Sequence, residues 1–131
     1  IGAAFRSVRP RGKGAAGKQA VNDCLFCKIV AGKIPSDRVY EDDQLIVFKD
    51  IHPKAPVHLL IVPRLHVESL NELTPAHDGL VAHMLRLLPD LARKQGLANG
   101  FRTIINTGPD GGQVIFHLHI HLLGGGRLPG F

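Results

Sequence analysis

Histidine and aliphatic residues alternate strictly in one segment near the end of the chain, FHLHIHLLGGG, which spans residues 116–126. Successive side chains of a β-strand point to opposite faces of a sheet, so a strand here separates the histidines from the aliphatic residues. The two sets are His117, His119 and His121, and Leu118, Ile120 and Leu122. Buried imidazoles need hydrogen-bond partners, and apolar side chains would pack better. The segment therefore predicts a strand over residues 114–123 with one core face and one functional face.

Three interpretations of the histidine face remain open from the residues alone. Histidines at i and i+2 can bind one metal ion. Alternatively, one histidine is a nucleophile while its neighbours orient it and stabilise charge. The third interpretation is an exposed strand face without a function. Glycines on both sides of the segment favour the second, because glycine backbone lets N–H groups approach an anion closely. Asn106 is either a turn residue or an amide donor to the same phosphate site.

The rest of the pattern predicts an α+β domain with an antiparallel sheet. A short helix over residues 24–31 is expected after a cap at Asp23, and a long helix from Thr74 to about Gln95, with its buried stripe at Leu80, Met84, Leu87, Leu88 and Leu91. Strands are expected at residues 39–41, 45–49, 57–62 and 101–106, in addition to the final one. The predicted order is α-β-β-β-α-β-β.

The charge distribution separates an arm from a domain. Lys and Arg number 16 against 11 Asp and Glu, for a net charge of +5, and residues 1–22 hold five of the basic groups and no acid. We therefore expect a flexible basic arm over residues 1–21, with a transit peptide as the alternative, and a folded domain over residues 22–131. The balanced charge of that domain gives no support for a nucleic-acid partner. No apolar run could span a bilayer, so we expect no membrane partner and a cytoplasmic location.

Three blocks of the sequence resemble the histidine-triad (HIT) superfamily, in its branch of histidine-triad nucleotide-binding proteins. They are CLFCKIVAGKIPSDRVYEDD, FKDIHPKAPVHLLIVPRLH and INTGPDGGQVIFHLHIHLLGG, and they cover roughly residues 23–126. The resemblance implies a five-stranded antiparallel sheet with two helices, and a homodimer with a ten-stranded sheet. It also implies a hydrolase that binds purine nucleoside monophosphates (AMP or GMP). Such enzymes cleave the P–N bond of adenosine phosphoramidates, and also acyl- or aminoacyl-adenylates, and require no cofactor for catalysis.

Roles for individual residues follow from the same resemblance. His119 matches the nucleophile that takes up the nucleotidyl group before water releases it, and His117, His121 and His58 match the other histidines of the site. The nucleotide-binding set implied in this way, together with Asn106, is Phe26, Ile29, Ile34, Phe48, Asp50, Ile51, Gly112, Val114, His119 and His121. Asp50 matches the carboxylate that accepts from the ribose hydroxyls. From the residues alone, His58 and the apolar members are core residues and Asp50 is a turn residue.

Val114 departs from the family pattern, because many relatives carry a polar side chain at this position. A valine cannot donate a hydrogen bond, so the leaving amine must take its proton from His119, His121 or water, or turnover is slower. Two other functions therefore remain open. They are dinucleoside polyphosphate hydrolysis, and nucleotide binding by a regulatory protein with weak turnover.

Cys24 and Cys27 form a C-x-x-C pair, which is half a zinc site, a redox motif or two small core residues. Some histidine-triad relatives bind structural zinc through such a pair and two histidines, and the matching positions here are His66 and His117. The resemblance thus implies a structural Cys2His2 zinc site that is not required for catalysis. A zinc-dependent hydrolase with the metal on the triad is the alternative.

Overall fold

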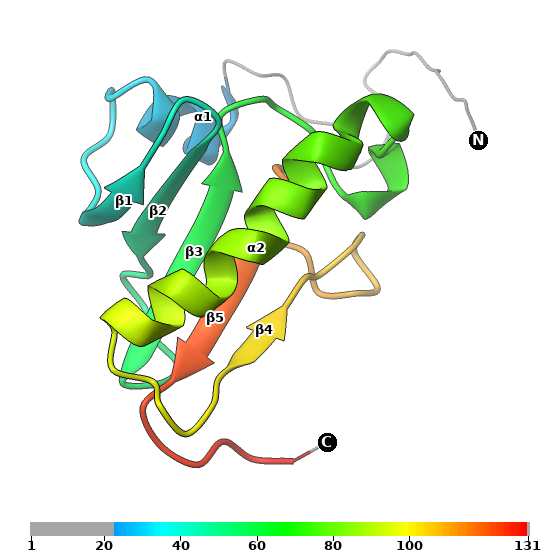
Figure 1. Cartoon of the computed structure of the whole chain (residues 1–131). Coiled ribbons are helices and arrows are strands. Elements are labelled where there is room, and N and C mark those ends of the chain that lie inside the picture. Colours follow the sequence, from blue (N-terminus) through cyan, green and yellow to red (C-terminus); the bar gives the residue numbers. More distant parts are fainter. Residues whose placement is uncertain (1–22, 131) are drawn as a thin grey trace.

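Five short strands form one antiparallel sheet in the computed structural model of the chain, which describes residues 23–130 (Figure 1). The strands are β1 Arg38–Glu41, β2 Leu45–Lys49, β3 Val57–Pro63, β4 Arg102–Ile104 and β5 Ile120–Gly124, in the spatial order β1-β2-β3-β5-β4. The apolar strands β2 and β3 are buried on both faces of the sheet. The predicted α+β class and element order are confirmed.

The helix α2, Asp78–Lys94, crosses one face of the sheet diagonally (Figure 1). It follows two short 3₁₀ turns, Leu70–Glu72 and Pro75–His77, and the second of these has Thr74 at its N-cap. The predicted apolar stripe of α2 is confirmed, because all five of its residues are buried. They pack on Leu45, Val47, Leu59, Ile61, Leu118, Ile120 and Leu122 from the sheet and the segment before β5.

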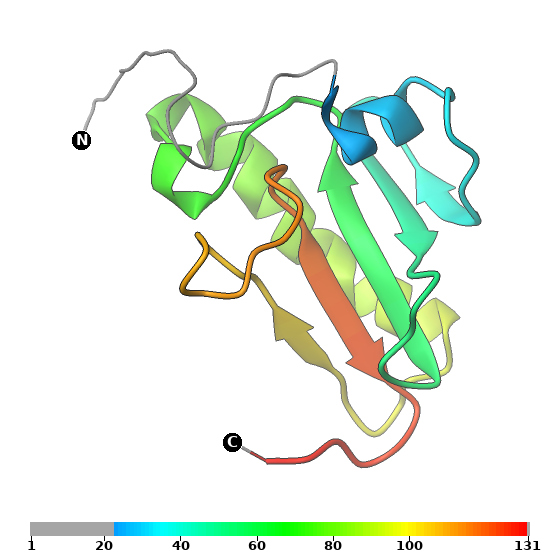
Figure 2. The same ribbon diagram turned by 180° about the vertical axis from the view of Figure 1, so that it is seen from behind.

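The opposite face of the sheet carries the short helix α1, Leu25–Val30 (Figure 2). Its buried residues Phe26 and Ile29 join a second apolar cluster with Cys24, Ile46, Phe48, Leu60 and Val62. The predicted cap at Asp23 is wrong. The Cys27 N–H donates instead to Cys24 Sγ at 3.3 Å, so the thiol of Cys24 occupies the capping position.

The final strand is shorter than predicted, since β5 begins at Ile120 and not at residue 114. Side chains still alternate between the two faces upstream of β5. The backbone there, however, does not make the regular hydrogen bonds that pair β5 with β3. Before β5, Leu118 N–H donates to the carbonyl of Val67 in the loop after β3. The buried Gln113 donates to the carbonyls of Glu68 and Ile115. β4 is likewise shorter than the predicted strand over residues 101–106.

The predicted basic arm over residues 1–21 lies outside the described residues. Within residues 23–130, no helix is long and apolar enough to cross a bilayer. The ten-stranded sheet of a homodimer stays a prediction.

Met84→Ala will destabilise the fold far more than Arg86→Ala, two residues along the same helix. Met84 is 1% exposed between α2 and the sheet, and Arg86 is exposed. Truncating a buried Met costs about 2–5 kcal/mol, whereas an exposed substitution stays within about 0.5 kcal/mol. Urea unfolding followed by circular dichroism gives both free energies of unfolding, and equal losses for the two variants would contradict the packing described here.

Candidate active site

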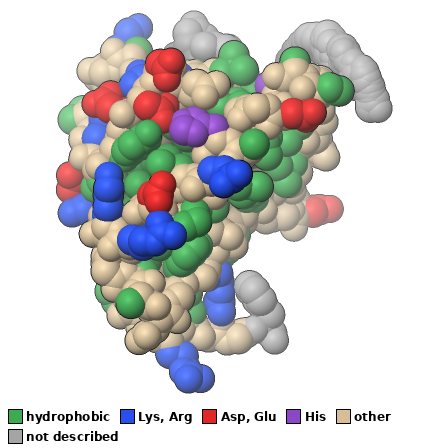
Figure 3. All heavy atoms as spheres, in the orientation of Figure 1, with side chains coloured by type: hydrophobic (Ala, Val, Ile, Leu, Met, Phe, Trp, Pro, Cys, Tyr) green, Lys and Arg blue, Asp and Glu red, His purple; other side chains and the backbone are tan. Residues whose placement is uncertain are grey.

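The three alternating histidines lie on the face of the sheet that carries α1, and the aliphatic residues between them lie under α2. Leu118, Ile120 and Leu122 belong to the α2 cluster, whereas Phe26 of α1 contacts the rings of His117 and His119 edge-on. The predicted separation into two faces is therefore confirmed. Histidine takes up little of the surface on the α2 side, in keeping with this placement (Figure 3).

His119 lies at the centre of this group, with its ring centroid 5.0 Å from those of both Phe26 and His121. Its Nδ1 is 2.7 Å from the carbonyl oxygen of His117. A carbonyl oxygen only accepts, so Nδ1 of His119 carries the proton. In the neutral ring, Nε2 then has a free lone pair, which is the form that a nucleophile needs.

A chain of hydrogen bonds fixes the opposite proton arrangement in His121. The backbone N–H of Lys54 donates to Nδ1 of His58 at 3.0 Å, so the neutral His58 ring carries its proton on Nε2. That Nε2 lies 2.9 Å from Nδ1 of His121 and 3.5 Å from a carboxylate oxygen of Asp50. With Nδ1 accepting from His58, the neutral His121 ring carries its proton on Nε2. Nε2 of His121 is therefore a hydrogen-bond donor, whereas Nε2 of His119 is an acceptor.

Burial keeps these rings neutral at pH 7. It lowers the pKa of His119 despite the hydrogen bond to the His117 carbonyl, which opposes the shift. Burial, together with repulsion from His119 and His58, lowers the pKa of His121 to about 4. The pKa of His58 is lowered by burial as well, against the attraction of Asp50. Uncharged imidazoles can act as nucleophile and hydrogen-bond donor without first losing a proton.

The residues that the resemblance assigns to the base and ribose are mostly brought together beside the histidines. Phe26 and Phe48 are buried and meet edge to face at 5.6 Å, while Ile29 and Ile34 belong to or pack on the same cluster. Asp50 follows β2 and is half-buried, with one carboxylate oxygen accepting from the His52 N–H at 2.8 Å.

Ile51 differs from the other residues of this set, because 84% of its surface is exposed and it belongs to neither apolar cluster. Its role in binding the base stays a prediction.

The loop before the triad is shaped by glycine and by one side chain that the sequence reasoning missed. A Cβ on Gly111 would collide with the carbonyl of Thr107, and Gly112 has a φ of +83°. Gln113 accepts from the N–H of Gly108 and donates to two carbonyls, so its buried side chain ties the loop together from within. The signal was an amide residue that directly follows a glycine-rich turn.

Other predicted members of the set line the same loop. The side-chain amide of Asn106 lies close to Gly112. Val114 is 83% exposed, so its side chain is open to solvent next to the buried Gln113.

The C-x-x-C pair meets two histidines in a compact cluster, Cys24, Cys27, His66 and His117, whose four ligand atoms lie within 4.8 Å of one another. Nδ1 of His117 lies 3.3 Å from Sγ of Cys24 and 3.5 Å from Sγ of Cys27. Nδ1 of His66 lies 3.2 Å from Sγ of Cys27 and 3.2 Å from Nδ1 of His117.

This cluster fits a tetrahedral zinc ion. With Zn–S bonds of about 2.3 Å and Zn–N bonds of about 2.0–2.1 Å, neighbouring ligand atoms would be about 3.3–3.8 Å apart, close to the separations found here. Nε2 of His117 donates to the carbonyl of Pro63 at 2.7 Å, which leaves its Nδ1 unprotonated for a metal. Burial also lowers the pKa of His117 to about 4, so the ring needs no deprotonation to act as a ligand.

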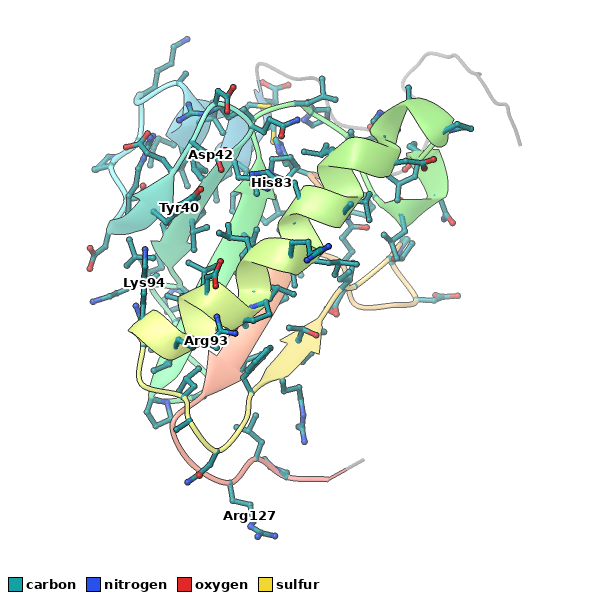
Figure 4. All side chains as sticks on the ribbon, in the orientation of Figure 1. Tyr40, Asp42, His83, Arg93, Lys94 and Arg127 are labelled. Carbon is teal, nitrogen blue, oxygen red and sulfur yellow. The ribbon has the colours of Figure 1, made fainter. Side chains whose placement is uncertain are left out.

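Two other histidines, His83 and His77, have structural contacts at α2 and in the turn before it. His83 of α2 pairs with Asp42 at 2.7 Å, and the Tyr40 hydroxyl donates to the same carboxylate oxygen (Figure 4). Burial alone would raise the pKa of Asp42, but the hydrogen bonds that it accepts hold this pKa well below its usual range. His77 accepts from the Thr74 N–H and caps the turn before α2.

A cavity of about 730 Å³ lies at the other end of β5 and includes none of the predicted site residues. Its walls come from residues 96–102 and 124–128, so Gly124, Gly125 and Gly126 line this cavity. The glycine-rich backbone near the histidines is therefore the loop before the triad and not the glycines after it.

Comparisons with known proteins agree on one family. The family profile described as "Scavenger mRNA decapping enzyme C-term binding" matches residues 23–127. Protein HitA of Neisseria gonorrhoeae is 49% identical to the chain over 104 residues, which cover 79% of this chain and 97% of HitA. Purine nucleoside phosphoramidase of Escherichia coli (strain K12) is 40% identical over 107 residues, 81% of this chain and 90% of that protein. The structure of a histidine triad protein from Clostridium difficile matches with a TM-score of 0.80 and 44% identity, over 83% of this chain and 96% of that one.

Acidification from pH 7 to pH 5 will lower the free energy of unfolding of the metal-free protein. The folded-state pKa of His121 is about 4 and that of His58 is also lowered, whereas an unfolded histidine titrates near 6.5. The unfolded chain therefore binds protons first, and the stability present above about pH 6.5 is lost as the pH falls.

Urea unfolding at pH 7, 6 and 5 with a chelator present measures this loss, and His121→Asn should show a smaller one. If the free energy of unfolding of the wild-type protein stays constant over this pH range, His58 and His121 are not buried as a neutral pair.

Proposed function

Because the chain belongs to the histidine-triad family, we propose that it is a nucleotide-binding hydrolase that cleaves the P–N bond of purine nucleoside phosphoramidates, with AMP or GMP as the nucleotide product. The observation that carries this proposal is the hydrogen bond from Nδ1 of His119 to the carbonyl of His117. It leaves Nε2 of a buried, neutral imidazole free to attack phosphorus.

In the first step, Nε2 of His119 attacks the α-phosphorus and the P–N bond breaks. The leaving amine takes its proton from a water molecule, and the nucleotidyl group stays on His119. His58 donates to Nδ1 of His121, so neutral His121 keeps its own proton on Nε2 and donates a hydrogen bond from it to a phosphoryl oxygen. Exposed Val114 has no proton to give to the amine.

In the second step, the hydroxide left by that water molecule attacks the same phosphorus and the bond to Nε2 of His119 breaks. His119 is then neutral again with its proton on Nδ1, which restores the starting arrangement. The products are the amine and the nucleoside monophosphate. A covalent intermediate splits one difficult hydrolysis into two easier steps.

The nucleoside part of the substrate is proposed to lie against the aromatic pair Phe26 and Phe48, with its ribose hydroxyls donating to Asp50. The 3.5 Å separation of Asp50 from His58 supports a pocket in which the ribose and the α-phosphate are close neighbours. Asn106 and the backbone near Gly112 are proposed to face the phosphate oxygens, because this loop leads directly into the triad.

We also propose a structural zinc ion on Cys24, Cys27, His66 and His117, and a homodimer. The ion would tie α1 to the loop after β3 and to the triad, with no part in the two chemical steps. The edge strands β1 and β4 support the dimer, because each has a sheet partner on one side only within the described residues.

His119→Ala will abolish phosphoramidase turnover, with a loss of at least about 1,000-fold in kcat, because the covalent route is removed. Wild-type protein mixed with an adenosine phosphoramidate and quenched during turnover should show AMP attached to His119 by mass spectrometry. The control is the thermal unfolding of the variant, which should stay cooperative. Wild-type turnover without a trapped adduct, and an active alanine variant, would refute the mechanism.

Protein purified without a histidine tag and kept reduced will contain about one zinc ion per chain. Its removal by a strong chelator should lower Tm by at least about 5 °C, because the energy of metal binding contributes to folding. Metal analysis and thermal unfolding test both statements. Cys24→Ser is the control variant, because it lacks one thiolate ligand and should not bind zinc tightly. Reduced protein with much less than one zinc per chain would remove the zinc proposal.

A further inference from the structure

The backbone that carries the proposed nucleophile lies just outside the sheet. The pairing of β3 with β5 reaches Ile120, opposite Ile61, and stops there. His117 and His119 precede that pair, in a segment whose backbone bends and does not follow the strand ladder. The sheet alone therefore does not hold these residues in place.

His117 supplies the missing support with its side chain. It is 0% exposed, its Nε2 donates to the carbonyl of Pro63, and its Nδ1 points into the cluster with Cys24 and Cys27. Its own carbonyl oxygen accepts the proton of His119 Nδ1 at 2.7 Å. One residue therefore joins the cysteine–histidine cluster to the group that sets the tautomer of His119.

The other metal-cluster residues also lie next to residues that contact the segment before β5. His66 immediately precedes Val67, whose carbonyl accepts from the N–H of Leu118 at 2.7 Å. Phe26 lies between the two cysteines in sequence, and its ring contacts the rings of both His117 and His119. Nε2 of His66 is buried and has no hydrogen-bond partner, so its polar contacts within the described part of the chain run through Nδ1 to the cluster.

We propose that metal binding by Cys24, Cys27, His66 and His117 positions the nucleophile, by fixing the His117 carbonyl that orients His119. The expected effect on kcat rests on the proposed function, whereas the expected effect on the orientation of His119 does not. The cluster residues act through His117 and are positioning residues. Without the metal, the ligand atoms lose their common partner. The segment before β5 then keeps its contacts within the protein, among them the hydrogen bonds of His117 with Pro63, of Leu118 with Val67 and of Ile115 with Gln113.

The kinetic consequence is a selective loss of kcat. Asp50 and Phe48 of the proposed nucleoside pocket come from β2 and its end, which are hydrogen-bonded to β3, whereas Phe26 of that pocket lies between the two cysteines. Nucleotide affinity should therefore change less than the rate of attack by a poorly aligned imidazole. Misplacing a reacting group or removing support around a metal site costs about 10–100-fold in rate.

Two substitutions at His66 separate a metal effect from a packing effect. His66→Ala removes one ligand, whereas His66→Cys keeps four ligands in a Cys3His set that zinc also accepts. His66 is suited to this test because its contacts are with the cluster and not with His119. His77→Ala, in the turn before α2, is the matched histidine control.

We expect His66→Ala to lose stoichiometric zinc and about 10–100-fold in kcat, with the Kd for AMP within about threefold of wild type. His66→Cys should keep zinc and most of the kcat, and His77→Ala should match wild type. If His66→Ala does not fold, wild-type protein stripped of zinc serves in its place. A zinc-free protein with full kcat overturns the proposal, as does wild-type protein that binds no zinc.

Nitrogen-15 NMR of the histidine rings tests the same idea without turnover. Zinc-loaded protein with AMP should show His119 protonated at Nδ1 only, whereas zinc-free protein should show a mixture of tautomers that returns to one form when zinc is added. An unchanged single tautomer without zinc contradicts the proposal. If loaded wild-type protein fails to hydrolyse phosphoramidates, the proposed function is wrong, and the NMR result still decides the positioning role.

Discussion

The hydrogen bond between Nδ1 of His119 and the carbonyl of His117 is the interaction on which the rest of the site depends. It selects one of the two neutral tautomers of a buried ring, and so decides which nitrogen has a free lone pair. The bond joins residues two apart in the sequence, and its geometry follows the local backbone. That backbone lies beyond the end of the β3–β5 pairing, so side-chain contacts from other segments have to hold it.

Opposite hydrogen-bond partners give neighbouring histidines opposite chemical characters. His119 donates through Nδ1, whereas Nδ1 of His121 accepts from His58, which itself accepts from the Lys54 N–H. Two identical side chains, with ring centroids 5.0 Å apart, are thereby arranged as an electron-pair donor and a hydrogen-bond donor. Burial lowers the pKa of both rings, so neither has to be deprotonated before it acts. Because the charged form is disfavoured, the same burial makes the protein sensitive to acid.

The two faces of the sheet divide structural and chemical tasks. Under α2 the face is apolar, apart from the pair of His83 with Asp42 at its border. Under α1 the apolar cluster shares its space with the histidines and the cysteine pair. Packing on one face makes the sheet a rigid base, and the groups that need exact proton placement are built on the other.

Much of this arrangement was determined by the sequence alone. The strict alternation of residues 117–122 fixed the two faces, because side chains of extended backbone point alternately up and down whether or not a ladder continues. The three blocks around it predicted the family, and the pattern of caps, turns and apolar runs predicted the element order and the α+β class. The cysteine spacing indicated half of a metal site, and the resemblance pointed to His66 and His117 as the other half.

Tertiary structure decided what depends on contacts between distant segments. The start of β5, the capping role of Cys24 and the tautomer of each histidine follow from the partners that the folded chain supplies. The buried role of Gln113 arises in the same way. Periodicity in a sequence reports which way a side chain points. It does not report which carbonyl or ring that side chain meets, because such partners come from distant segments, as Cys24 and His117 do at 93 residues apart, and are brought together only by packing.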